Sequence, residues 1–152
     1  MSKLSIKTFQ SGSLGCNCSI IHSADTKEAI IIDPGDDEKL ILDEVKKLDL
    51  KVKLLLHTHA HFDHISCSKA VKDHTHSKIC LHKADKTLYQ SLPIQRAMFG
   101  FAPSMPGKVD EWIEDGQEYS LNFADGEFKN FLTTIYTPGH TEGSCSFYTE
   151  YF

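Results

Sequence analysis

The chain has 152 residues, a formal net charge of −5, 40% hydrophobic residues and 24% charged residues, which suits one soluble globular domain over residues 1–152 with a buried core. The acidic balance and the absence of a basic run argue against a nucleic-acid-binding protein, and no apolar run approaches the roughly 18 residues of a membrane-spanning helix. Five cysteines without a C-x-x-C pair, and an N-terminus without the apolar segment of a signal peptide, predict reduced thiols in the cytoplasm.

The first part of the chain predicts a strand–helix–strand unit preceded by two short strands. In chain order, we expect strands at 4–9, 17–23 and 28–35, a helix at 36–50 and a strand at 52–57. The helix is indicated by apolar residues on one face between Leu40 and Leu48, by acids in its first turn, and by Lys46 and Lys47 near its end. The first flanking strand is a continuous apolar run and the second also reads as a buried strand, so we expect them to be parallel and to lie in a covered sheet.

The second part of the chain mixes helices, strands and one long irregular stretch. We expect helices at 63–74 and 84–92, and strands at 78–82, 118–123, 130–137 and 144–151, the last three in an antiparallel or mixed sheet. Residues 93–116 hold three prolines and three glycines, so we predict a long loop with little regular structure. The apolar residues of this loop would be unusual in a free linker, so we favour a loop that covers a functional site.

The segment HTHAHFDH, which begins at His57, places four histidines and one aspartate in eight positions directly after a predicted parallel strand. Sites in α/β sheets tend to form at this end of a strand. Imidazole nitrogens and carboxylate oxygens are ligands of zinc, and ligands at i and i+2 can point the same way. His59 and His61 have that spacing, and so does His57 if the strand continues, so spacing alone leaves the choice open. Asp63 and His64 would serve a second ion or hold the first ligands in place.

Two motifs carry a resemblance to a known family. Residues 58–64, Thr-His-Ala-His-Phe-Asp-His, resemble the Thr-His-x-His-x-Asp-His signature of the metallo-β-lactamase superfamily, and residues 137–144 resemble its Thr-Pro-Gly-His-Thr-x-Gly-Ser segment. Residues 17–35 resemble its opening strands and Asp-Pro-Gly turn. Residues 98–119 are similar to the loop of its glyoxalase II-like (hydroxyacylglutathione hydrolase-like) branch. The resemblance covers nearly the whole chain and implies an α/β (α+β) fold, the αββα sandwich of that family.

The resemblance also implies a ligand set. His59, His61 and His140 would bind the first metal, and Asp63 and His64 would bind the second. Zinc is the expected metal, with iron and manganese as alternatives. Asp63 is also expected to be the catalytic carboxylate that orients the attacking water.

Several residues near these motifs are expected to be structural. His57 matches no ligand of the family and is expected to hydrogen-bond near its strand end, while Asp33 is expected to support the site without reacting. Cys16 and Cys18 lack the spacing and the second pair of a zinc hook. The remaining histidines, at positions 22, 74, 76 and 82, are expected at the surface or at sheet edges.

The implied activity is hydrolysis of a small-molecule thioester, such as a hydroxyacyl-glutathione, by a zinc-dependent enzyme of the glyoxalase II type. A bound metal lowers the pKa of its water from 15.7 to about 7 and polarises the carbonyl under attack. The departing thiolate needs little help from an acid because thiols have a pKa of about 8.5. Lactonase and persulfide dioxygenase are the alternatives within the superfamily, and a catalytically silent metal-binding fragment or assembly module is the alternative of another class.

Two features depart from the family's pattern. Residues 65–67, Ile-Ser-Cys, stand where the family usually has Ile-Gly-Gly, and Cys67 is expected to be a small buried thiol. The chain ends at Phe152, before the turn that carries the family's bridging aspartate and before its last histidine. We therefore expect a C-terminally truncated sandwich, with one metal site complete and the second incomplete, and with a sheet face that a homo-oligomer would cover.

Overall fold

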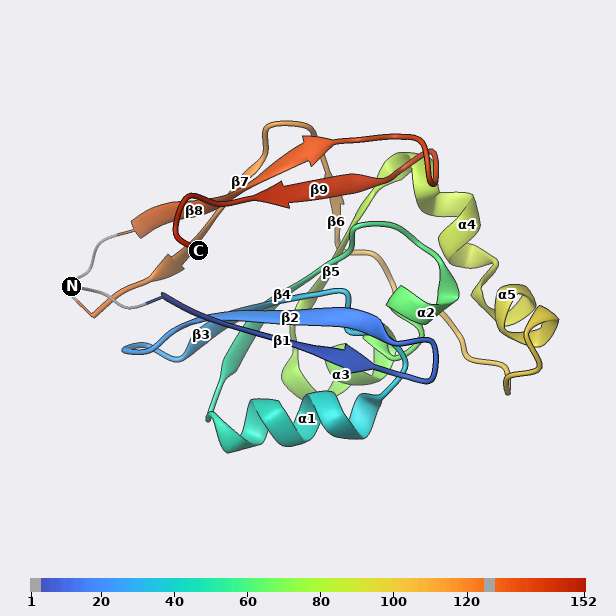
Figure 1. Cartoon of the computed structure of the whole chain (residues 1–152), viewed down its shortest axis with the longest axis horizontal. Coiled ribbons are helices and arrows are strands. Elements are labelled where there is room, and N and C mark those ends of the chain that lie inside the picture. The colour runs from blue at the N-terminus through green and yellow to red at the C-terminus, as the bar shows by residue number, and fades with distance from the viewer. Residues whose placement is uncertain (1–3, 125–127) are drawn as a thin grey trace.

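The computed structural model describes residues 4–124 and 128–152, which form two sheets and a set of short helices (Figure 1). The six-stranded sheet has the order β1 (Leu4–Ser11), β2 (Cys16–Ser23), β3 (Glu28–Ile32), β4 (Lys51–Leu56), β5 (Lys78–His82) and β6 (Glu111–Ile113). The three-stranded sheet has the order β7 (Glu118–Asn122), β8 (Phe128–Tyr136) and β9 (Cys145–Tyr148). The helices are α1 (Glu38–Lys47), α2 (Phe62–Ile65), α3 (Ser68–Thr75), the 3-10 helix η1 (Lys83–Asp85), α4 (Lys86–Gln90) and α5 (Leu92–Met98).

The six-stranded sheet is the middle layer of the molecule. Helices α1 and α3 lie on one of its faces, and the three-stranded sheet lies on the other (Figure 1). On β4, Leu55 belongs to the apolar core shared with the helices, whereas its neighbour Leu56 belongs to the core between the two sheets. On β3, Ile31 and Ile30 divide in the same way. Because successive side chains point to opposite faces, a strand segment buried on both faces needs consecutive apolar residues, as residues 30–32 of β3 and residues 54–56 of β4 provide.

The predicted strand–helix–strand unit is confirmed. Strands β3 and β4 pair in parallel, with α1 between them in the chain. The Asp37 side chain caps α1 by accepting a hydrogen bond from the Leu40 amide at 3.0 Å. β5 and β6 continue the parallel pairing, whereas β1–β2, β2–β3 and the whole second sheet are antiparallel. The α+β class expected from the sequence is therefore correct.

The prediction of a loop over residues 93–116 is wrong at both ends. Helix α5 occupies Leu92–Met98, with Pro93 in its first turn, where the missing amide hydrogen costs no helical hydrogen bond. Strand β6 pairs in parallel with β5, and the Asp110 carboxylate accepts a hydrogen bond from the Ile79 amide at 2.8 Å just before that pairing begins. Residues 99–110 form the remaining loop.

The helix predicted over residues 63–74 is interrupted. The Ser66 hydroxyl donates to the Phe62 carbonyl at 2.5 Å, and the Cys67 amide donates to the Gly35 carbonyl at 2.9 Å instead of continuing the helix. These bonds end α2 and turn the chain into α3. The predicted helix over residues 84–92 is likewise divided into η1 and α4. Within the described ranges, no helix is long and apolar enough to cross a membrane.

Candidate metal centre

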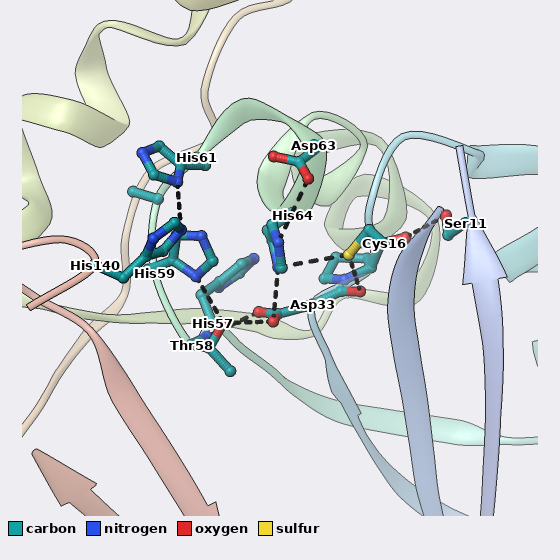
Figure 2. Close-up of polar contacts among 12 residues, drawn as sticks. Ser11, Cys16, Asp33, His57, Thr58, His59, His61, Asp63, His64 and His140 are labelled. Atoms are coloured by element: carbon teal, nitrogen blue, oxygen red, sulfur yellow. Dashed lines mark hydrogen bonds and ion pairs between the residues drawn. The ribbon is translucent and has the colours of Figure 1, made fainter. Parts of the chain in front are cut away.

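The histidine-rich loop connects the carboxyl end of β4 to α2. It lies next to the loop between β8 and β9. His59 and His61 lie on the first of these loops and His140 lies on the second, so each sheet contributes to one cluster (Figure 2). This placement follows from the parallel order of the central strands, because their carboxyl ends share one edge.

The three histidines are close enough to share one ion. Their ligand nitrogens all lie within 4.8 Å of one another, and Nδ1 of His61 is 3.0 Å from Nε2 of His140. A tetrahedral zinc ion with Zn–N bonds of about 2.0–2.1 Å separates its nitrogens by about 3.3 Å. The observed spacing therefore fits a single ion bound by His59, His61 and His140.

The protonation of the cluster also suits a metal. Burial, with a smaller contribution from the neighbouring His64, lowers the pKa of His59 to about 4, and burial lowers the pKa of His61 in the same direction. Both rings are therefore neutral at pH 7 and keep a lone pair for a cation. Nε2 of His59 is buried and has no hydrogen-bond partner among the described residues, which is the condition expected of a nitrogen that binds a metal.

A chain of hydrogen bonds from Asp33 fixes the orientation of His59. Asp33 is 3% exposed, and its carboxylate accepts a hydrogen bond from the Thr58 amide at 2.8 Å and another from the Thr58 hydroxyl at 2.5 Å. Because that hydroxyl donates to Asp33, it accepts from Nδ1–H of His59, 2.9 Å away. The proton on Nδ1 leaves the lone pair on Nε2, which faces His61 and His140 (Figure 2).

Asp63 and His64 lie beside the three-histidine cluster. Nε2 of His64 is 3.5 Å from the Asp63 carboxylate, and the ring centroids of His64 and His59 are 4.1 Å apart. Nδ1 of His64 contacts Asp33 at 2.9 Å and the Cys16 sulfur at 3.5 Å. Burial opposes protonation of His64, but the hydrogen bonds and charge interactions with Asp33 and Cys16 together outweigh burial and raise the pKa of His64 to about 10. Their role as ligands of a second metal stays a prediction.

His57 takes no part in the cluster. The ring is fully buried, and both nitrogens are occupied, Nδ1 by the Cys80 carbonyl at 3.0 Å and Nε2 by the Ser68 hydroxyl at 2.7 Å. Burial lowers the pKa of His57, so the ring is neutral: Nδ1 donates to the carbonyl and Nε2 accepts from the hydroxyl. His57 thus hydrogen-bonds near its strand end, as expected, and joins β4 to β5 and α3.

Two features of the site have no signal in the sequence. The buried carboxylate of Asp85 accepts hydrogen bonds from both loops that carry the histidines, although the sequence around Asp85 predicts only a helix. A cavity of about 590 Å³ opens beside His61 and His140, and α4 and the following turn line it with Thr87, Leu88 and Ser91. Both features depend on tertiary packing, which local patterns do not encode.

The chain is similar to proteins that are named as hydrolases. Residues 11–151 match the sequence model described as "Metallo-beta-lactamase superfamily". Hydroxyacylglutathione hydrolase GloC of Haemophilus influenzae is 37% identical over 132 residues, which cover 86% of this chain and 59% of that protein. A probable polyketide biosynthesis zinc-dependent hydrolase of Bacillus velezensis, BaeB, is 32% identical over 126 residues, which cover 83% of this chain and 47% of that protein.

Solved structures show the same fold. The B3 metallo-beta-lactamase BLEG-1 superposes with a TM-score of 0.80 at 27% identity, covering 96% of this chain and 68% of the other. TTHA1623, solved in a di-iron-bound form, also superposes with a TM-score of 0.80, at 24% identity, over 94% of this chain and 66% of the other. The chain thus spans roughly half to two thirds of the length of the relatives named above.

Proposed function

Because the chain belongs to the metallo-β-lactamase superfamily and brings three histidines together at one point, we propose that it is a metal-dependent hydrolase that acts on a thioester. The observation that carries the proposal is the buried Nε2 of His59, which has no partner among the described residues and faces His61 and His140. A nitrogen in this position is satisfied when the cluster holds a cation. Zinc is the proposed cation, and a relative named as a zinc-dependent hydrolase supports it.

The chain's own residues prepare the reaction in two ways. His59, His61 and His140 would hold the metal, which when bound supplies Lewis acidity and a water whose pKa falls from 15.7 to about 7. The hydrogen-bond chain through Thr58 keeps His59 in the tautomer that offers Nε2. The ligand geometry is therefore set before substrate arrives, which avoids reorganisation during the reaction.

Asp63 is the proposed catalytic carboxylate. It lies in the first turn of α2, two residues after His61, and its side chain is 25% exposed. The contact with His64 at 3.5 Å leaves carboxylate lone pairs free to accept a proton from a water bound among the histidines. His64 contacts the Asp63 carboxylate and lies beside His59, which places Asp63 next to the cluster.

The proposed substrate is a small thioester, of which hydroxyacyl-glutathione is the model case. The 37% identical relative named hydroxyacylglutathione hydrolase supports this choice. The cavity of about 590 Å³ beside His61 and His140 accommodates the acyl or thiol portion, with the hydroxyls of Thr87 and Ser91 available for hydrogen bonds. A thiolate leaves readily because its conjugate acid has a pKa of about 8.5, so the site needs no strong general acid.

Metal analysis combined with a thioester assay tests the proposal. We expect the purified chain to bind about one zinc ion per chain at the three histidines and to release thiol from a hydroxyacyl-glutathione. His59→Ala should abolish both properties. The same assay on a lactone and on a β-lactam distinguishes thioesterase specificity from the other activities of the superfamily. Thiol release that persists at the wild-type rate in His59→Ala would contradict the proposal, as would a folded wild-type chain that binds no metal.

A further inference from the structure

Asp85 is a buried carboxylate that touches both loops of the metal centre without belonging to the ligand cluster. It ends η1 and is 1% exposed. One oxygen accepts a hydrogen bond from the Ala60 amide at 2.9 Å, between His59 and His61 in the chain, and another from the Thr141 hydroxyl at 2.8 Å. The other oxygen accepts from the Gly143 amide at 2.7 Å.

We propose that Asp85 is a positioning residue: it holds the loop of His140 against the loop of His59 and His61 and thereby sets the affinity of the site for its metal. The inference rests on the metal site of the proposed function. The three donors to Asp85 come from both loops and occupy both of its oxygens. Its carboxylate is therefore committed to the backbone and to Thr141, and it acts on the metal only through the loops.

The loop that carries His140 is built to move as one piece. The Ser144 hydroxyl accepts a hydrogen bond from the Thr141 amide at 3.0 Å and lies 2.9 Å from the Thr141 hydroxyl. The Gly139 amide donates to the Thr141 carbonyl at 3.0 Å, which closes the turn around His140. Because these bonds lie within residues 139–144, releasing Thr141 from Asp85 would displace the turn and His140 together.

Gly143 independently shows how closely Asp85 fits this turn. A Cβ atom built on Gly143 would lie 2.7 Å from both Cγ and the backbone nitrogen of Asp85. Real Cβ atoms essentially never approach other atoms so closely, so any larger residue at 143 must push the loop away from Asp85. The absence of a side chain at this position lets the backbone reach the carboxylate.

The expected effect is a partial loss of affinity. Metal sites tolerate deviations of about 0.2 Å in ligand distance, and loss of a group that orients ligands typically weakens metal binding by about 10–100-fold. One tie between the loops survives without Asp85, because the Cys145 amide donates to the Thr58 carbonyl at 2.7 Å. The site should therefore form but bind metal more weakly.

The test compares Asp85→Asn with Asp110→Asn in the full chain. Asparagine keeps one acceptor and turns the other into a donor that opposes an N–H or O–H group of the loops. Asp110 also accepts a backbone amide, that of Ile79, but it lies outside the histidine cluster. Zinc affinity is measured by competition with a chromophoric chelator, coordination by the absorption of the cobalt-loaded chain, and folding by thermal unfolding of the metal-free chain. We expect Asp85→Asn to lose about 10–100-fold in zinc affinity and to change the cobalt spectrum, and Asp110→Asn to change neither.

Each other outcome has a definite meaning. Equal zinc affinities for Asp85→Asn and the wild type would overturn the inference and leave the metal site intact. An equal loss in Asp110→Asn would overturn it too, because the effect would then be general destabilisation. A folded wild-type chain without zinc affinity would overturn the metal site and, with it, the proposed function. If Asp85→Asn fails to fold, Thr141→Val decides: this variant removes one donor while keeping the shape, so it should bind zinc more weakly than the wild type, and unchanged affinity would refute the inference.

Discussion

Nδ1 of His61 lies 3.0 Å from Nε2 of His140, although 79 positions separate the two residues in the chain. His61 follows β4 of the six-stranded sheet, and His140 lies between two strands of the other sheet. The pair can approach only when the two sheets are packed against each other. Metal binding at this pair would therefore report the native arrangement of the two layers.

Replacing His140 should lower the zinc content of the chain, whereas replacing an ordinary surface histidine should not. His140→Ala removes one of the three nitrogens and should reduce bound zinc from about one ion per chain to a small fraction of that after dialysis. The matched control is His74→Ala, because His74 is exposed on α3, where it contacts the Ala70 carbonyl of its own helix and, more distantly, Glu38. Elemental analysis of both variants decides, and equal zinc in the two would contradict the assignment of His140.

Replacing His57 should damage stability and spare the metal. His57→Ala leaves the buried Ser68 hydroxyl without its partner and removes the side-chain bond to the Cys80 carbonyl, which keeps only the backbone amide of residue 57 at 3.2 Å. Each buried group left unpaired costs about 1–3 kcal/mol of the free energy of unfolding. Urea unfolding measures that loss, while the zinc content of the folded fraction should match the wild type. A folded His57→Ala chain that has lost its zinc would show that His57 belongs to the metal centre.

Glu28 should make part of the stability depend on pH. Its carboxylate, on β3, accepts hydrogen bonds from the backbone and side-chain amides of Asn122, both at 2.9 Å, and pairs with Lys53 at 3.1 Å. Burial raises the pKa of Glu28, but these bonds outweigh it and lower the pKa below the ordinary value of 4.5. A group with a lowered folded pKa contributes stability above its unfolded pKa and loses it as the pH falls through the folded value.

Glu28→Gln should therefore destabilise the chain at pH 7 and have progressively less effect as the pH falls below about 4.5. The control is Glu114→Gln, which removes the same charge from an exposed side chain. Urea midpoints across that pH range provide the measurement. A difference between wild type and Glu28→Gln that stays constant into strong acid would show that the ionised carboxylate is not what stabilises this contact.

Gly35 should be intolerant of a side chain. It has a φ of +81°, and a Cβ atom there would lie 2.6 Å from the Ser11 hydroxyl oxygen. Its amide donates to the His64 carbonyl at 3.0 Å, so displacement of this turn also disturbs α2. A residue held in this region of φ costs about 1–3 kcal/mol before any clash. Gly116→Ala is the control, because Gly116 has a φ of +74° with nothing within 4 Å of the added Cβ.

Thermal or urea unfolding of the two glycine variants isolates the contribution of the Ser11 contact. Gly116→Ala measures the cost of the backbone conformation alone, and Gly35→Ala should lose clearly more. Equal losses would mean that the turn moves aside from Ser11 without cost.

Local patterns predicted the parts of the fold that depend on local chemistry. The apolar run ending at Leu56 and the capped helix after Asp37 led to the correct parallel pairing, and parallel pairing placed the histidine loop at the carboxyl edge of the sheet. The prolines and glycines of residues 93–116 predict no helix α5, because proline usually interrupts a helix, whereas Pro93 lies in a first turn, where proline is compatible with a helix. The break at Ser66 was missed because it depends on a long-range bond, from the Cys67 amide to the Gly35 carbonyl.

Motifs identify the candidate ligand residues, but they do not identify the residues that hold those ligands in place. Spacing marks His57, His59 and His61 as candidates without choosing among them, and both the choice of His59 and His61 and the link to His140 rest on the resemblance. Asp85 lies 25 positions beyond Ala60 and 58 before Gly143, and nothing in its local sequence marks it as a partner of either. Contacts between residues so far apart are set by the packing of the two sheets, which only the folded structure shows.

The long span between His61 and His140 has a mechanical consequence. An ion bound by both residues would cross-link the two sheets and close a loop of 79 residues between them. Metal clips that close long loops restrict the unfolded chain most strongly, because they remove conformations that the open chain could sample. The three histidines proposed to bind the catalytic metal would then also hold the two sheets together, and removing the ion would weaken the packing between the sheets.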